Sequence, residues 1–493
     1  MDARNQDGVS LPPGHSGSSF FHHVLAEAVA KFPQTFGAAA FPADAASFKR
    51  SYGDALVRFE LARAAAAERV EIARLISDRT QQQLVYRDPS GAPLLEEHMA
   101  APLSPPEMTR EQGNGRAPGL VPEVEFQGRV YRRREIVELC EQLNARHHMT
   151  HAALAAARWI IDHIEQRGGS LDLSGQRFAL LGAGAELAPT PLLLRAGATV
   201  LWVDIAEPST RLDASERGGA LLLAQGARDV LRAPREVAAA ITRLADDGPV
   251  HVGMFAYAGG ASLEWRLGAA MNAIVRRLEP SAVQTISLFV SPTMPANVQP
   301  EDAVAADQKL ARRPLWQSLW KGVGALPVPG RLTSDDACVA RAIVSIQGVS
   351  YQAAQYVSKV AAAETYAVYG IRPQAEPRQP VTVSANVAGI TKTRSLAHPL
   401  FQAAFVGASR FDVCIFEPHT TRALSGLLVL HDLLNPNAPG AARVQPAAPR
   451  EKAALLLSQQ VHGGIYSLPY ALEPAIRIAA VLGMAQRPSV LWS

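Results

Sequence analysis

Short apolar runs alternate with longer amphipathic stretches from about residue 176 onwards. The runs predict strands, and the stretches between them are long enough to form helices. Strands that are joined by helices become parallel neighbours in one sheet, with the helices on its faces. The pattern therefore predicts an α/β fold built on a doubly wound parallel sheet. The predicted strands are Phe178–Leu181, Thr199–Val203, Val250–Tyr257, Thr285–Val290, Ala342–Ile346 and Val381–Asn386.

The chain before this pattern is mostly helical. Residues 1–18 are polar and contain glycine, serine and proline, which predicts disorder. Apolar residues at three-to-four spacing predict helices between Phe20 and Gln83, and again across Arg134–Gln166. Between these helices, Pro102–Pro118 predicts a long loop or linker, and Val124–Tyr131 alternates as a short hairpin does.

These patterns divide the chain into four parts. The sheet-forming part is the largest and carries an insertion, and the last part either closes over the site or forms an interface. The parts are a disordered segment 1–18, a mostly helical N-terminal extension 19–170, a sheet-forming domain 171–450 with the insertion 291–337, and a C-terminal closing segment 451–493.

A glycine turn joins the first two predicted strands of the domain. Phe178–Leu181 leads into Gly182 and Gly184, a helix-like segment follows, and the next strand stops on Asp204. Glycines let a backbone approach a phosphate closely, and amides at a helix start bind anionic oxygens. A carboxylate placed like Asp204 accepts both hydroxyls of an adenine ribose. The order indicates a Rossmann-like mononucleotide-binding unit, although Leu187 replaces the third glycine of the motif.

Composition argues against several classes of protein. The formal net charge of +3 is too small to favour nucleic acid as a partner. The cysteines Cys140, Cys338 and Cys414 are far apart, which fits a reducing compartment and argues against a disulfide framework or a zinc ribbon. The first residues lack the apolar core of a signal peptide, and no uninterrupted apolar run is long enough to cross a membrane. We expect a cytoplasmic protein with no integral membrane segment and no metal site.

Several later segments resemble those of the short-chain dehydrogenase/reductase family, in the same order along the chain. Ala227–Val237 (ARDVLRAPREV) is similar to the family's third-strand segment, whose acid touches adenine and is here Asp229. Ala256–Gly259 (AYAG) resembles the family's NNAG turn with both asparagines replaced. Ser345–Glu364 resembles the catalytic helix, and Asn386–Leu396 resembles the sixth-strand segment. The resemblance covers about half of the chain.

The resemblance implies a catalytic tyrosine, lysine and serine. Hydride transfer to a carbonyl needs a proton donor, and a tyrosine serves when a nearby ammonium lowers its pKa. Tyr356 and Lys359 are three residues apart on one helix face, whereas Tyr351 meets the uncharged Gln355 at the family's four-residue spacing. We therefore favour Tyr356–Lys359 over Tyr351–Gln355. The candidates for holding the carbonyl are Ser291, Ser345 and Ser350.

The resemblance also implies a nicotinamide cofactor. Asp204 favours NAD because a carboxylate repels the 2′-phosphate of NADP, while the nearby Arg211 leaves NADP as an alternative. Thr393 would donate to the amide or diphosphate of the cofactor. The expected cofactor-binding residues are Gly182, Gly184, Glu186, Asp204, Asp229, Ala258, Gly259, Gly389 and Thr393.

The insertion contains a segment that is both basic and rich in tryptophan. In residues 307–326 (DQKLARRPLWQSLWKGVGAL), lysines and arginines interleave with leucines and tryptophans. We interpret this segment as a helix packed on the body of the protein with solvated basic rims. A lid over an apolar substrate and a contact with a membrane surface are the alternatives.

Together these features predict an NAD(P)-dependent oxidoreductase that transfers a hydride to or from a carbonyl or alcohol. The apolar surroundings favour a hydrophobic or acyl-type small-molecule substrate. One alternative is a non-catalytic nucleotide-binding or assembly protein, which the lost asparagines and the shifted Tyr–Lys spacing favour. A second is an S-adenosylmethionine-dependent methyltransferase, since that class also begins with a glycine turn and an acid. The resemblance further implies a homodimer formed through the helix that carries Tyr356.

Overall fold

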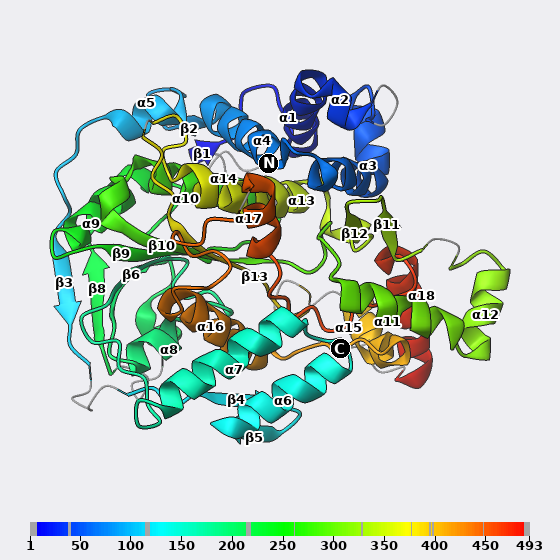
Figure 1. Ribbon diagram of the computed structural model, residues 1–493. Coiled ribbons are helices and arrows are strands. Elements are labelled where there is room, and N and C mark those ends of the chain that lie inside the picture. The colour runs from blue at the N-terminus through cyan, green and yellow to red at the C-terminus, as the bar shows by residue number, and fades with distance from the viewer. Residues whose placement is uncertain are drawn as a thin grey trace.

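A seven-stranded, mostly parallel sheet forms the centre of the structure (Figure 1). Six strands are parallel, and β3 lies antiparallel at the edge beside β8. Numbered along the chain, the six parallel strands lie in the order 6-5-4-1-2-3 across the sheet, which is compatible with a Rossmann-like fold. From one edge to the other the strands are β13 (Thr382–Val387), β10 (Val283–Val290), β9 (Val250–Met254), β6 (Arg177–Leu181), β7 (Thr199–Val203), β8 (Ala220–Ala224) and β3 (Met108–Glu111).

The computed structural model describes residues 7–37, 41–113, 119–212, 218–260, 262–326, 329–375, 377–393, 396, 399–446 and 448–487. Within those ranges, no helix combines the length and the apolar character that a membrane span requires. The described α-helices are α1 (Gly17–Lys31), α2 (Pro33–Phe36), α3 (Ala45–Ala65), α4 (Arg69–Gln83), α5 (Leu95–Ala100), α6 (Arg134–Ala145), α7 (His151–Glu165), α8 (Thr190–Arg195), α9 (Pro234–Ala245), α10 (Leu263–Arg277), α11 (Pro300–Ala311), α12 (Leu315–Gly322), α13 (Val349–Gln355), α14 (Ala362–Tyr369), α15 (Pro399–Gly407), α16 (Pro418–Leu434), α17 (Pro449–Leu456) and α18 (Leu472–Gln486).

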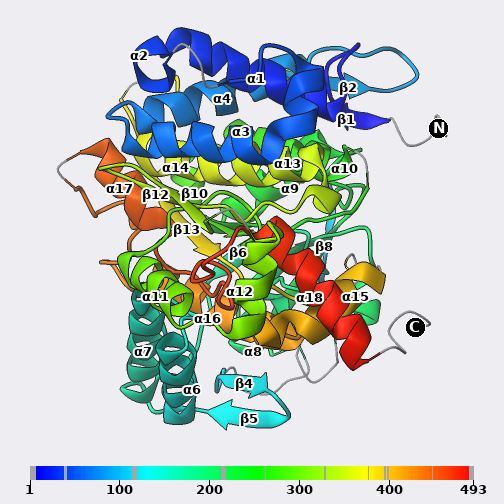
Figure 2. The ribbon, with the colours of Figure 1, turned by 90° about the vertical axis from the view of Figure 1, so that its right-hand side faces the viewer.

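Helices cover both faces of the sheet and create two hydrophobic cores. One face carries α9, α10, α13 and α14, and the other carries α7, α8 and α16 (Figures 1 and 2). Neighbouring side chains of a strand point to opposite faces, so each strand feeds both cores. In β7, Leu201 and Val203 join the first core, while Val200 and Trp202 join the second.

The N-terminal helices form a further layer over α13 and α14 (Figure 2). Their apolar side chains belong to the same core as that face of the sheet, and the Phe20 ring stacks on Trp265 of α10 at 5.0 Å between ring centroids. Before them, β1 (Gly8–Ser10) pairs with β2 (Val85–Arg87). Disorder was therefore the wrong prediction at Gly8–Ser10, whose backbone this pairing orders, while residues 1–6 lie outside the described residues.

A buried ion cluster joins this layer to the helices on the sheet. Arg63 of α3 is fully buried and donates to Glu60 on its own helix at 2.8 Å and to Glu364 of α14 at 2.6 Å. Arg69 of α4 donates to the same Glu364 carboxylate at 2.7 Å. The two arginines hold the pKa of Glu364 below its usual value in spite of its burial. Two cations and two anions thus neutralise one another inside the core.

Most of the predicted strands are confirmed. Thr199–Val203 is β7, and the runs beginning at Phe178, Val250, Thr285 and Val381 lie within or overlap β6, β9, β10 and β13. Ala342–Ile346 is wrong as a strand of this sheet, because the place beside β10 is taken by β13. The nearby strand β12 (Cys338–Ala340) pairs with β11 (Arg331–Thr333) and bridges to Asn297, and it does not join the central sheet.

The third parallel strand is β8, which the sequence pattern did not indicate. Its residues, ALLLA, include no β-branched or aromatic side chain, so their intrinsic preference is helical. The segment Ala227–Val237 that resembled this strand forms a loop and the start of α9 instead.

The segments before the domain also differ in part from prediction. The long loop predicted for Pro102–Pro118 contains β3, which pairs with β8 and so belongs to the central sheet. Residues 114–118 of that loop lie outside the described residues. The hairpin predicted for Val124–Tyr131 is confirmed as β4 (Glu123–Phe126) and β5 (Arg129–Arg132). Helix is confirmed across most of Arg134–Gln166 as α6 and α7.

We expect Arg63→Met to lower the free energy of unfolding by about 3–5 kcal/mol, because it leaves the buried carboxylates Glu60 and Glu364 short of a partner. Urea unfolding measures this loss. Arg58→Met is the matched control, since Arg58 is exposed on the same helix. Equal stability of the two variants would contradict the structural importance of the cluster.

Candidate active site

A cavity of about 470 Å³ opens at the carboxyl ends of β6, β9, β10 and β13. Doubly wound sheets bind ligands outside these ends, at the point where the strand order reverses. That point lies here between β6 and β9. The cavity brings together seven of the site residues that the sequence nominates, which is about half of them. These are Glu186, Gly259, Ser291, Tyr351, Lys359, Gly389 and Thr393.

Three hydroxyl groups meet on one wall of the cavity. Ser291, the first residue after β10, and Thr293 share a hydrogen bond of 2.9 Å between their hydroxyls, and Tyr351 of α13 lines the cavity with them. Burial and the Glu264 carboxylate raise the pKa of Tyr351, and the hydrogen bonds from Ser291 and Thr293 lower it. The phenol of Tyr351 is therefore protonated at neutral pH, and its pKa is shifted in the direction opposite to the lowering that the resemblance implies for a catalytic tyrosine.

An amide connects this wall to a buried acid. The side-chain oxygen of Gln355 accepts from the Ser291 amide at 3.0 Å, and its nitrogen donates to Glu264 at 2.9 Å. Burial raises the pKa of Glu264 to about 7, although Lys359 and Gln355 pull it down. Burial lowers the pKa of Lys359, and the Glu264 charge opposes that shift. The cavity thus holds an acid that titrates near neutrality and a desolvated amine.

A π-helical turn, Tyr356–Ala361, determines which side chains face the cavity. Tyr351 and Lys359 are eight residues apart, and a regular α-helix of about 3.6 residues per turn would point them in different directions. A π-turn holds one residue more than an α-turn, so it rotates later side chains back toward the face of Tyr351. Both side chains line the cavity as a result.

Tyr356 lies outside the cavity, contrary to our preference from the sequence. Its ring is fully buried, and its hydroxyl contacts Glu60 and accepts from Arg63 Nε at 2.9 Å. The ion cluster therefore holds this hydroxyl on the far side of the helix from the cavity. Tyr351, the second choice, lines the cavity with Lys359, and so does Tyr257.

The other two candidate serines do not line the cavity. Ser345 donates to the Glu473 carboxylate of α18 at 2.8 Å. Ser350 packs against α1, where a Cβ at Gly17 would lie 2.1 Å from its hydroxyl oxygen. Ser291 is therefore the candidate serine that the structure places with Tyr351.

The glycine turn after β6 is held by the acid that ends β7. Gly182 has a φ of +90°, and a Cβ there would meet the Ala256 nitrogen at 2.2 Å. The Gly184 amide donates to Asp204 Oδ2 at 2.9 Å, and the Ala206 amide donates to Oδ1 at 2.8 Å. Each carboxylate oxygen retains a second acceptor site, so Asp204 is still able to receive a ribose hydroxyl.

The helix after the glycine turn begins later than the motif predicts. The turn continues to α8 (Thr190–Arg195), so the helix start is separated from Gly182 and Gly184. Ala185, Glu186 and Leu187 of this turn line the cavity instead. Any contact with a diphosphate would come from the turn amides and not from a helix end.

The adenine side of the predicted site contains one more cation than the sequence indicated. Asp229 accepts from two amides of its own loop after β8. Arg228 donates to the Asp204 carbonyl oxygen at 3.0 Å and pairs with Glu207 at 2.6 Å. Arg228 therefore accompanies Arg211 near the acid, with its charge already matched by Glu207.

The loop after β9 presents open backbone to the cavity. A Cβ placed on Gly259 or on Gly260 would meet no atom within 4 Å, and both residues line the cavity after Ala258. A flat ligand group is able to approach such backbone closely. Apolar side chains also line the cavity. They include Phe255, Phe289, Ile390, Phe401, Phe405 and Ile476.

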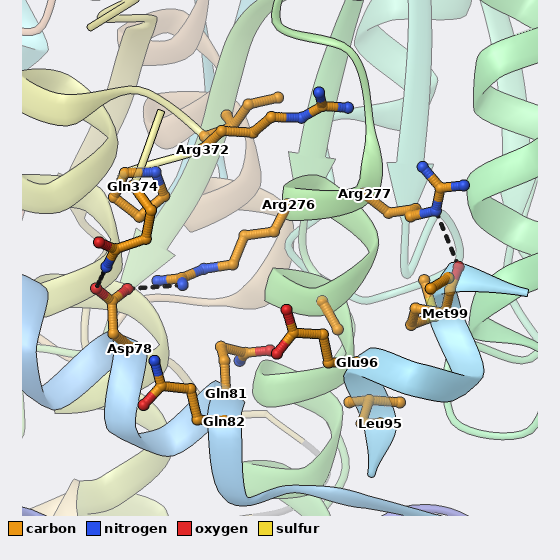
Figure 3. A pocket seen from close by; sticks show the side chains of 14 residues that line it. Asp78, Gln81, Gln82, Leu95, Glu96, Met99, Arg276, Arg277, Arg372 and Gln374 are labelled. Atoms are coloured by element: carbon orange, nitrogen blue, oxygen red, sulfur yellow. Dashed lines mark hydrogen bonds and ion pairs between the residues drawn. The ribbon is translucent and has the colours of Figure 1, made fainter. Parts of the chain in front are cut away.

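A second cavity, of about 450 Å³, lies among α4, α5, α10 and the segment after α14 (Figure 3). Arg276 pairs with Asp78 at 2.7 Å, and Arg372 pairs with Glu279 at 2.6 Å. Arg277 turns to the other side and donates to a backbone carbonyl. These groups mainly satisfy one another, and the hydroxyl–amine arrangement of the first cavity is absent from the residues that line this one.

A scan against known protein families finds no match for this chain, and a search of curated proteins finds none either. Across the described residues, no three His, Cys, Asp or Glu side chains converge as metal ligands do. The assignment of the site rests on its geometry.

Glu264→Gln should stabilise the protein at high pH. The pKa of about 7 in the folded state exceeds the ordinary value of 4.5, so the unfolded chain releases this proton first and stability falls as pH rises between the two values. The variant removes that loss, and we expect a gain of up to about 3 kcal/mol near pH 8 that disappears below about pH 4.

Denaturant unfolding at several pH values measures the gain for Glu264→Gln. The control is Glu417→Gln, because Glu417 is exposed and pairs with Lys392 at the surface. A gain that is the same at low and high pH would show that Glu264 is ionised normally in the folded protein.

Proposed function

We propose that this protein is an NAD(P)-dependent oxidoreductase, similar to short-chain dehydrogenase/reductases, that acts on a carbonyl or alcohol. The observation that carries the proposal is the meeting of Tyr351, Ser291 and Lys359 in one cavity at the carboxyl ends of the strands. The order of the six parallel strands supports a doubly wound Rossmann-like fold, which binds dinucleotides across this edge.

The residues present fit a nicotinamide dinucleotide. Asp204 would hold the adenine ribose, and its charge favours NAD because Arg228 is already paired with Glu207. The open backbone at Gly259 and Gly260 and the hydroxyl of Thr393 would hold the other half. When bound, the cofactor would supply the hydride chemistry that no side chain provides.

The side chains of Ser291, Tyr351 and Lys359 would control the proton transfer to the substrate. Ser291 would hold the carbonyl oxygen of the substrate, and Tyr351 would donate its phenolic proton to that oxygen. The Lys359 ammonium would favour the resulting phenolate electrostatically, as an opposite charge does in a site that excludes water. Glu264 would set the charge on Lys359, because the carboxylate favours the ammonium form.

The apolar side chains of the cavity support a hydrophobic or acyl-type substrate. Phe401 and Phe405 come from α15, and Ile476 comes from α18, so two helices outside the sheet contribute to this lining. Apolar contacts of this kind fix the body of a ligand while a few polar groups fix its reacting end.

A non-catalytic nucleotide-binding protein is the second candidate. It is favoured by the late start of α8 and by the Gly184 amide, which is already engaged by Asp204. This candidate predicts binding of a nucleotide without turnover of any carbonyl substrate.

Thermal unfolding in the presence of NADH, NADPH or S-adenosylmethionine tests the cofactor. A ligand at about 100 times its Kd should stabilise the protein by about 2.7 kcal/mol. We expect the shift with NADH and its loss in Asp204→Ala. A shift with S-adenosylmethionine alone would favour a methyltransferase over an oxidoreductase. The absence of a shift with all three ligands would contradict the proposed cofactor.

Two tyrosine variants separate catalysis from stability. Tyr351→Phe should keep NADH binding and lower kcat by about 100-fold or more, because it removes the proton donor. Tyr356→Phe should instead lower the free energy of unfolding, since it removes a hydroxyl from the buried ion cluster, and leave kcat nearly unchanged. NADH oxidation with a panel of apolar ketones and aldehydes measures kcat. The reverse pattern would return the catalytic role to Tyr356.

A further inference from the structure

The helix α12, together with Val323 directly after its end, presents an apolar stripe to solvent. Leu315, Leu319 and Val323 follow one another at four-residue spacing, and their exposed fractions are 85%, 72% and 76%. Side chains at this spacing share one face of a helix. Large aliphatic side chains that stand together in water favour an apolar partner.

The opposite face of α12 is anchored to the body. The Trp316 ring meets Phe411 edge-on at 5.2 Å between centroids, and Trp320 also packs against the hydrophobic core. The buried Gln317 accepts from the Tyr470 hydroxyl. The helix stands at the periphery of the molecule (Figures 1 and 2). Its stripe is therefore presented by a fixed element of the fold.

The charge around the stripe is positive. Residues 309–333 contain five lysines and arginines and no acid. Lys309 pairs with Asp412, and Arg331 pairs with Asp307. Both acids lie outside residues 309–333. Of the remaining three, Arg313 donates to a carbonyl and a hydroxyl. Arg312 and Lys321 are exposed, and neither has an acidic partner within 4 Å in the described part of the chain.

We propose that α12 docks this protein on an anionic lipid bilayer. The aliphatic stripe would enter the boundary between headgroups and acyl chains, while Arg312, Arg313 and Lys321 would meet lipid phosphates. This inference does not depend on the proposed reductase activity, because no residue of α12 lines the cavity.

A second copy of the chain fits this surface less well. A stable dimer buries about 800 Å² on each partner, which is far more than three aliphatic side chains offer. A two-fold contact would also place the same uncompensated cations opposite each other. The charge therefore selects an anionic surface as the occupant.

Sedimentation with vesicles tests the proposal on the full-length protein. We expect binding to vesicles of phosphatidylcholine mixed with phosphatidylglycerol, and about tenfold less binding to phosphatidylcholine alone or at high salt. The double variant Leu319→Glu, Val323→Glu should not bind, and Lys321→Glu should bind more weakly. Ile205→Glu is the matched control, since Ile205 is equally apolar and 76% exposed on a different element.

Three results would overturn the inference. Wild-type protein that stays in solution with both kinds of vesicle would remove the lipid partner. Equal sedimentation of the double variant and the Ile205→Glu control would place the contact elsewhere. Light scattering that finds a dimer broken by the double variant would assign the stripe to a second copy. Circular dichroism of each variant verifies folding, which these exposed positions should not affect.

Discussion

The ion cluster inside the core constrains more of this structure than any other interaction. Arg63, Arg69, Glu60 and Glu364 come from three helices and are nearly excluded from water. Burying four charges is costly, and the cost is offset only when every charge keeps its partners and geometry. The helices α3, α4 and α14 must therefore meet in one arrangement. The N-terminal layer is fixed on the sheet by this requirement as well as by apolar packing.

The same cluster influences the cavity through Tyr356. Arg63 and Glu60 hold the Tyr356 hydroxyl at the start of the π-turn, so they fix the rotation of the helix about its own axis at this residue. The extra residue of the turn then directs Lys359 to the face that Tyr351 occupies. A residue pair that a regular α-helix would set about 80° apart thereby points more nearly the same way into one cavity. The electrostatics of the N-terminal layer and the geometry of the candidate site are coupled in this way.

The sequence predicted the parts of this structure that depend on local pattern. Buried parallel strands rich in Val, Phe and Ile stood out, and the glycine turn with Asp204 indicated the edge of the sheet where the cavity opens. The sequence pattern did not predict strand β8, because its Ala and Leu residues lack a preference for β-structure. The sequence could not predict the choice between Tyr351 and Tyr356 either, for another reason. That choice depends on Glu60 and Arg63, whose contact with Tyr356 spans almost 300 residues of chain, and on a π-turn that no spacing rule for α-helices anticipates.

The protonation states of Glu264 and Lys359 connect the fold to the chemistry that is proposed for the cavity. Glu264 and Lys359 are each pushed toward their neutral forms by burial and toward their charged forms by one another. Their protonation is therefore sensitive to whatever charge a ligand brings. A cationic group near the pair would favour the Glu264 carboxylate, whereas an anionic group would favour the Lys359 ammonium. Gln355 connects Glu264 to Ser291, because its side-chain amide donates to the Glu264 carboxylate and accepts from the backbone amide of Ser291. The protonation of the groups next to Tyr351 therefore responds to the charge that is placed in the cavity.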